Sequence, residues 1–215
     1  MIYLVDSGVN DAVVKCLTHF SINDDPTDRV GHGTSMAYII KSVAPTSEIT
    51  SVKLGDQNPN LCNTLRCLDF IDKTATSGVL LFNANFPATE NIKELESILG
   101  HLASRLTIVV PAGNNADSIE HYSPARCNFV YTIGSLNKSR KPTSVTNFDS
   151  VSKKIDLYVV STSIPSLNAN GQPIKVFGTS VAAAIVAALI DSQETNDNNI
   201  IKASVEKYND KLAFN

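Results

Sequence analysis

Four short segments of the sequence carry side chains that together suit nucleophilic catalysis. Asp6 follows the apolar run 2–5, and His32 stands in a Gly-His-Gly-Thr segment. Asn114 ends a Pro-Ala-Gly-Asn segment, and Ser180 precedes a long apolar stretch. A serine hydroxyl becomes a good nucleophile when an imidazole takes its proton and a carboxylate orients that imidazole. An amide side chain can donate to the oxyanion that then forms, so these four residue types indicate acyl transfer through a serine.

Each of these residues, taken alone, also has an ordinary structural explanation. An aspartate in Asp-Ser-Gly is typical of a turn, and a serine before an alanine-rich run is typical of a helix N-cap. A histidine at a helix start and an asparagine in a loop are equally common. The catalytic interpretation therefore depends on the combination of the four.

Short apolar runs that predict buried strands alternate with runs of helical periodicity. The predicted strands are residues 2–5, 49–54, 79–82, 106–110, 129–133 and 155–160, and the predicted helices lie within 36–43, 61–72, 92–102 and 181–190. This alternation predicts one α/β domain over residues 1–215, with a doubly wound parallel sheet covered by helices on both faces. The functional crevice of such a sheet lies at the carboxyl ends of its strands, where the four segments fall.

Composition excludes several classes of protein. Hydrophobic residues make up 43% and charged residues 18%, a balance typical of a chain with a core. The net charge is −3 and the one tight basic cluster is small, so no nucleic-acid partner is expected. The longest apolar run, residues 181–190, is too short to cross a membrane, and no phosphate-binding glycine motif follows a strand.

The remaining signals concern the compartment and metals. The four cysteines contain no Cys-x-x-Cys pair, and buried free thiols are favoured over two disulfides. The start of the sequence lacks a secretory signal, which predicts a cytoplasmic protein, with a processed secreted chain as the alternative. Residues 23–28 are rich in aspartate but lack spaced calcium ligands, so we expect a solvated loop. We expect neither a metal nor a cofactor.

The order of the four residues resembles that of the subtilisin-like serine proteases. Asp28 and the Gly-His-Gly-Thr segment resemble the family's Asp-x-x-Gly-His-Gly-Thr motif, and residues 177–180 resemble its nucleophile segment. Shorter resemblances occur at 43–45, 123–125 and 147–148. The resemblance implies a subtilisin-like fold and a serine endopeptidase that hydrolyses peptide bonds in a peptide or protein substrate.

The resemblance also implies a role for each candidate residue. Ser180 would be the nucleophile, His32 the general base and acid, and Asp6 the residue that orients the imidazole. Asn114 would donate to the oxyanion together with the backbone N–H of Ser180. The main alternative is a catalytically silent module of the same fold that binds a peptide or protein, and the intact set of four residues favours the enzyme.

A set of substrate-binding residues is implied in the same way: Asn85, Phe86, Pro87, Gly113 and Tyr122. Pro87 departs from the family pattern, because proline lacks the N–H that an extended substrate would pair with. Tyr122 stands where many members have a glycine, which predicts a narrow pocket for the residue before the cleaved bond. A tyrosine that turns outward is the alternative. No pro-domain is recognisable, so a separate inhibitor or regulatory segment is a further candidate partner.

Overall fold

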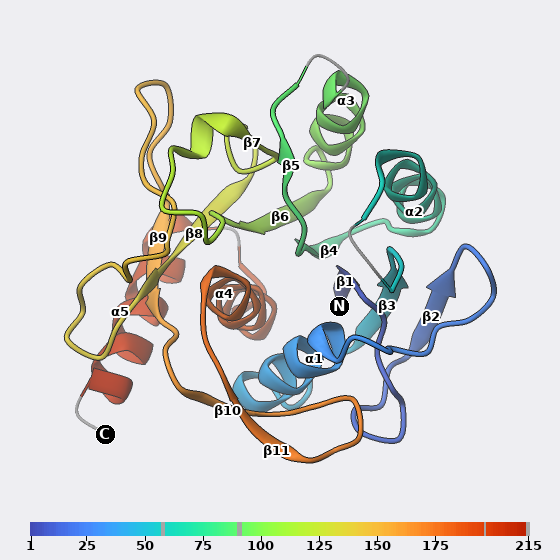
Figure 1. Ribbon diagram of the computed structural model, residues 1–215, viewed down its shortest axis with the longest axis horizontal. Coiled ribbons are helices and arrows are strands. Elements are labelled where there is room, and N and C mark those ends of the chain that lie inside the picture. Colours follow the sequence, from blue (N-terminus) through green and yellow to red (C-terminus); the bar gives the residue numbers. More distant parts are fainter. Residues whose placement is uncertain (57–58, 90–91, 196, 214–215) are drawn as a thin grey trace.

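The computed structural model describes residues 1–56, 59–89, 92–195 and 197–213, and its centre is a parallel sheet of seven strands (Figure 1). The strand order is β2-β3-β1-β4-β6-β8-β9. These strands are β1 (Ile2–Asp6), β2 (Thr18–Ser21), β3 (Ile49–Lys53), β4 (Gly78–Phe82), β6 (Leu106–Pro111), β8 (Tyr131–Leu136) and β9 (Leu157–Val160). The doubly wound α/β fold expected from the sequence is confirmed.

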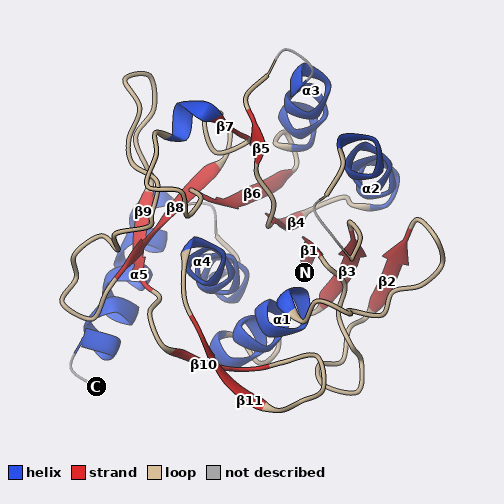
Figure 2. Cartoon of the chain, in the orientation of Figure 1, coloured by secondary structure: helices blue, strands red, loops and turns tan. Residues whose placement is uncertain are grey.

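Helices cover both faces of the sheet, as Figure 2 shows. They are α1 (His32–Val43), α2 (Leu61–Thr74), α3 (Lys93–Leu102), α4 (Thr179–Gln193) and α5 (Asn198–Ala213). In β1, Ile2 and Leu4 face the core that contains α1 and α4, whereas Tyr3 and Val5 face the core that contains α2 and α3. Successive side chains of a strand point to opposite faces, so a sheet covered twice requires continuous apolar runs.

Two small antiparallel sheets lie outside the main one. The strand β5 (Phe86–Pro87) pairs with β7 (Tyr122–Ser123), directly after a short 3₁₀ helix, η2 (Ile119–His121). The strand β10 (Ile164–Leu167) pairs with β11 (Pro173–Val176) and forms a hairpin that leads into α4. None of these four short strands is predicted by the sequence pattern.

Two elements of the main fold were also missed, and two strands begin later than predicted. The edge strand β2 contains both polar and apolar residues and is only partly buried, so it lacks an apolar run. The helix α5 packs on the sheet through few apolar residues, among them Ile201 and Val205. The strand predicted at 129–133 starts two residues later, at Tyr131, because Phe129 is exposed before the sheet begins. Strand β9 likewise begins at Leu157, two residues later than predicted.

The helix α5 is fastened along the edge strand β9 by a buried asparagine. Asn209 is fully buried, and its Oδ1 accepts the N–H of Val160 at 2.8 Å. Its Nδ2 donates to the carbonyl oxygen of Tyr158 at 2.9 Å. At the surface, Arg140 pairs with Glu206 and Asp210 of the same helix.

Two further expectations from the sequence concern the state of the cysteines and the presence of a membrane-spanning helix. All four cysteines are free thiols, and Cys16, Cys67 and Cys127 are buried. Cys62 is exposed, contrary to the expectation, because it lies away from the face of α2 on which Cys67 and Leu68 are buried. Within the described ranges, no helix is long and apolar enough to cross a membrane.

Candidate active site

Asp6 and His32 meet at the carboxyl edge of the sheet, at the end of β1 and the start of α1. His32 Nδ1 lies 2.7 Å from Asp6 Oδ1. The same oxygen accepts the N–H of Ser7 at 2.7 Å, and Asp6 Oδ2 accepts Nδ2 of Asn83 at 2.9 Å. The carboxylate of Asp6 is therefore buried and held in one orientation by three donors.

Asn83 was not among the residues singled out from the sequence. It follows β4 directly, just as Asp6 ends the neighbouring strand β1. A polar residue at the end of a predicted buried strand was the signal that could have identified it.

The charge of Asp6 controls the protonation of His32. Attraction to the Asp6 carboxylate raises the pKa of His32 above its usual value, although burial acts to lower it. The hydrogen bond to Asp6 and the charge of Asp28 add to the increase. The imidazole side chain remains 40% exposed, so it is accessible to a bound molecule.

A buried carboxylate organises the first turn of α1. Asp28 Oδ1 accepts the backbone N–H groups of Gly31 at 2.7 Å and Val30 at 3.1 Å, and the hydroxyl of Ser7 at 2.9 Å. Its Oδ2 accepts the N–H of Thr34 at 2.8 Å and the Thr34 hydroxyl at 2.7 Å. The expectation of a solvated loop is wrong for Asp28, which is 1% exposed. The N–H groups at a helix start have no partner within the helix, and this carboxylate supplies one.

Gly33 allows α1 to approach β1 closely enough for the Asp6–His32 contact. A Cβ atom on Gly33 would lie 2.1 Å from the carbonyl oxygen of Gly8 and 3.2 Å from Asp6 Cβ. Its N–H donates to the hydroxyl of Ser7 at 3.0 Å. A larger residue would push the start of the helix away from the strand.

The segment after β6 contacts the turn that bears Ser180. Asn114 Oδ1 accepts the N–H of Thr179 at 3.1 Å, and Gly113 N–H donates to the Thr179 hydroxyl at 3.2 Å. Gly178 precedes the helix with a φ of 109°, and a Cβ there would lie 3.2 Å from Asn114 Nδ2. Ser180, in the first turn of α4, is partly exposed.

The loop that carries Asn114 is fixed by a second buried asparagine. Asn147 is fully buried, and its Oδ1 accepts the N–H groups of Asn115 at 2.9 Å and Asp117 at 3.2 Å. Its Nδ2 donates to the carbonyl oxygen of Ala112 at 2.9 Å. A single side chain thus holds three points of this loop.

A cavity lies beside the candidate site, next to His32. It measures about 340 Å³ and is lined by His32 on one side and by Phe177 and Val181, which flank the Ser180 turn, on the other. Among the residues that the structure describes, no hydrogen bond connects His32 with Ser180. The structure therefore places the Asp6 carboxylate against the His32 imidazole. It places the Asn114 amide against the turn that bears Ser180.

The candidate substrate-binding residues gather around the small sheet of β5 and β7. Pro87 pairs with Tyr122 in this sheet, Phe86 is buried and Pro87 is exposed. Asn85 Nδ2 donates to the carbonyl oxygen of Pro111 at 2.8 Å, just before Gly113. The Tyr122 hydroxyl donates to Asp117 Oδ2 at 3.3 Å, so the end of its ring is directed toward the Asn114 loop.

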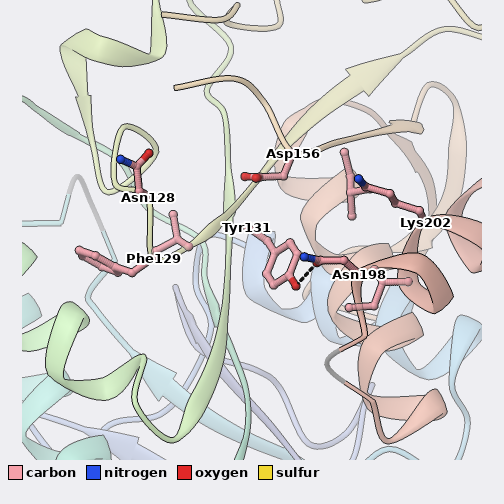
Figure 3. A pocket seen from close by; sticks show the side chains of 9 residues that line it. Asn128, Phe129, Tyr131, Asp156, Asn198 and Lys202 are labelled. Carbon is pink, nitrogen blue, oxygen red and sulfur yellow. Dashed lines mark hydrogen bonds between the residues drawn. The ribbon is translucent and has the colours of Figure 1, made fainter. Parts of the chain in front are cut away.

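Another cavity, of about 260 Å³, lies at the opposite edge of the sheet, near the amino ends of β8 and β9 (Figure 3). Tyr131 donates a hydrogen bond there to Asn198 of α5, and Asp156 and Lys202 line the same space. None of the candidate site residues lines it.

Replacing Asp28 with asparagine will destabilise the protein, because an amide in this position cannot accept from all five donors. We expect a loss of at least about 2 kcal/mol in the free energy of unfolding, measured by urea denaturation. Asp25 serves as the control, since it lies in the same loop and pairs with the exposed Arg29. Asp25→Asn should cost much less, because an exposed ion pair contributes little to stability, and equal losses in both variants would contradict the organising role of Asp28.

Comparison with known proteins agrees with this geometry. The model of the subtilase family matches residues 14–197. Proteinase T of Parengyodontium album is 28% identical over 205 residues, covering 87% of this chain and 68% of that protein. Subtilisin-like protease 1 of Pseudogymnoascus destructans is 25% identical, covering 87% of this chain. This chain spans half the length of the latter protein.

The fold is also similar to that of solved structures of subtilisin-like proteins. The crystal structure of a cold adapted subtilisin-like serine proteinase matches with a TM-score of 0.81 and 24% sequence identity. The match covers 94% of this chain and 79% of that protein. With the fold confirmed as subtilisin-like and the family model matching most of the sequence, this chain belongs to the subtilase family.

Proposed function

We propose that the protein is a serine endopeptidase that hydrolyses peptide bonds through an acyl-enzyme on Ser180. The observation that carries this proposal is the buried Asp6 carboxylate, 2.7 Å from the imidazole of His32. His32 lines a cavity together with Phe177 and Val181, the residues on either side of the Ser180 turn. Membership of the subtilase family supports the same reaction. The substrate class is a peptide or protein.

In the proposed mechanism, His32 accepts the proton of the Ser180 hydroxyl as the serine oxygen attacks the peptide carbonyl. Asp6 holds the imidazole and stabilises its protonated form, which agrees with the raised pKa of His32. His32 then gives the proton to the leaving amine. Water hydrolyses the acyl-enzyme by the same route, with His32 again acting as base and then as acid.

Asn114 Nδ2 and the backbone N–H of Ser180 are proposed to donate hydrogen bonds to the oxyanion. Asn114 Oδ1 already accepts the N–H of Thr179, which determines the side of the amide that carries the donor. The N–H of Ser180 lies at the start of α4, where helix N–H groups and the helix dipole favour negative charge. The loop of Asn114 is held by Asn147 and the N–H of Ser180 belongs to the first turn of α4, so little reorganisation is needed during the reaction.

The substrate is proposed to bind along the edge formed by five residues: Asn85, Phe86, Pro87, Gly113 and Tyr122. Pro87 has no N–H, so pairing with an extended substrate at this position is limited to its carbonyl oxygen. The bond between Tyr122 and Asp117 anchors a phenol beside this edge. A side chain of this size supports a narrow pocket that prefers small or medium residues before the cleaved bond.

A fluorophosphonate, which modifies activated serines, should label the wild-type protein and not Ser180→Ala. Ser192→Ala is the matched control, because Ser192 is an exposed serine on the same helix. Its labelling should equal that of the wild type. A folded protein whose Ser180 is not labelled would favour the binding module over the enzyme.

The pH dependence of kcat/KM should report the protonation of His32. Only the neutral imidazole accepts a proton, so activity should rise with pH around a midpoint above the ordinary histidine value of about 6.5. Asp6→Asn removes the largest cause of the raised pKa, and should move this midpoint to lower pH while reducing the plateau. His101→Gln, at an exposed histidine on α3, should leave the midpoint unchanged. A midpoint that does not respond to Asp6→Asn would exclude His32 as the titrating base.

Loss of the Asn114 amide should affect the chemical step more than substrate binding. In subtilisin, another member of the family, removing one such donor lowers kcat by about 10² to 10³. We expect a similar loss in Asn114→Ala and at least as large a loss in Asn114→Asp, which retains the acceptor for the N–H of Thr179. Steady-state kinetics should show little change in KM, and the neighbouring Asn115→Ala should retain most of the activity. A change confined to KM would contradict the oxyanion role.

A further inference from the structure

A second cluster of reactive side chains lies outside the proposed active site, in the segment that connects β1 with β2. Asp11, Cys16 and His19 each offer one atom able to bind a metal ion, and these atoms lie within 4.8 Å of one another. It is the one group of three such residues found within the described ranges. Sequence analysis did not identify it, because the spacing of five and three residues matches no common metal motif.

Asp11 is the centre of this cluster. Its Oδ1 lies 2.7 Å from His19 Nε2 and accepts the N–H of Cys16 at 3.0 Å. Its Oδ2 is 2.7 Å from Nζ of Lys15, an exposed side chain. The backbone and the side chains around Asp11 thus already converge on its carboxylate, and the three possible metal ligands lie in one region.

The hydrogen bonds within the cluster leave one ring nitrogen of His19 without a partner. Nδ1 of His19 is buried and has no hydrogen-bond partner among the described residues. A neutral imidazole has one N–H and one lone pair, and the N–H is used when Nε2 donates to the carboxylate of Asp11. The ring nitrogen that faces Asp11 is Nε2, so Nε2 is the atom able to bind a metal in this cluster, and coordination there would place the ring proton on Nδ1.

We propose that Asp11, Cys16 and His19 form a zinc site that links the β1–β2 connection to the edge strand β2. A thiolate, an imidazole and a carboxylate are the donors that Zn²⁺ takes in proteins, whereas Ca²⁺ and Mg²⁺ prefer oxygen alone. Three protein ligands leave the fourth tetrahedral position to water. As the Zn–S bond forms, the Cys16 thiol releases its proton to solvent, and no atom changes its oxidation state.

The charges and distances are compatible with this ion. One carboxylate and one thiolate balance the two positive charges of Zn²⁺. Bond lengths of about 2.0 to 2.3 Å place neighbouring ligand atoms roughly 3.5 Å apart, so small movements of the present side chains are sufficient. Lys15 contacts Oδ2 and not Oδ1, and its side chain is 81% exposed, so it can move away from the ion.

Zinc at this position would stabilise the part of the sheet that is least covered. The strand β2 is an edge strand with no fully buried residue, bound to β3 on one side. His19 belongs to β2, whereas Asp11 and Cys16 belong to the connection that precedes it. The ion would therefore join the edge strand to the connection that precedes it.

The test is a titration of the reduced, metal-free chain of residues 1–215 with Co²⁺, followed by Zn²⁺. Cobalt bound by a cysteine gives a thiolate charge-transfer absorption, and one equivalent of Zn²⁺ should abolish it. Calorimetry should show one zinc site, and zinc should raise the melting temperature. Ser180→Ala protein is used in parallel, so that self-digestion does not affect the result and the outcome is independent of the proposed peptidase activity.

Variants identify the ligands. Cys16→Ser should abolish the absorption, and His19→Gln or Asp11→Asn should weaken zinc binding at least about tenfold. Two controls should bind as the wild type does: Cys62→Ser, at the exposed thiol, and His121→Gln, at a histidine that pairs with Asp117 where no cysteine is present. Melting curves without metal identify any variant that fails to fold, and His19→Gln, at a partly exposed side chain, then replaces Cys16→Ser as the decisive variant.

Two results would overturn the proposal. The first is the absence of one-equivalent zinc binding at micromolar concentration in the folded wild type. The second is binding that survives Cys16→Ser and His19→Gln, or that disappears in Cys62→Ser, because the metal would then be held elsewhere on the molecule.

Discussion

The buried carboxylate of Asp28 is the interaction on which this end of the molecule depends. It accepts hydrogen bonds from Ser7, which follows β1, from the turn before α1, and from Thr34 in the first turn of that helix. A buried charge is tolerated only when donors surround it, so three segments are forced to converge on one point. The contact between Asp6 and His32 is a consequence of this convergence, since each residue is adjacent to a segment that Asp28 holds.

The other half of the site is positioned by burial. Helix α4 is apolar around most of its circumference and packs beside α1 against the same face of the sheet (Figure 1). Displacing its first turn would disturb that packing, and Asn114 and Gly113 bind the turn from the end of β6. Hydrogen bonds fix His32, whereas apolar packing fixes Ser180, and the packing of α1 against α4 relates the two.

Elements buried on both sides could be predicted, because they require unbroken apolar runs. The edge strand β2 and the helix α5 could not, since a partly exposed element needs few apolar residues. Sequence order identified the residues of the candidate site, but it did not reveal that Asn83 contacts Asp6 or that Asp28 turns inward. The direction of a side chain in an irregular segment depends on contacts with distant residues, and the local pattern does not contain this information.

Asn209 determines how the sheet ends at β9. Its side chain presents one acceptor and one donor to Val160 and Tyr158, which is the pairing that one residue of an adjacent strand would offer. The side chain of one asparagine on a helix thus makes the two hydrogen bonds that a residue of a further strand would make. A strand from a second molecule finds these backbone groups already occupied, so growth of an intermolecular β-sheet is blocked at this edge and the protein is protected from edge-to-edge aggregation there.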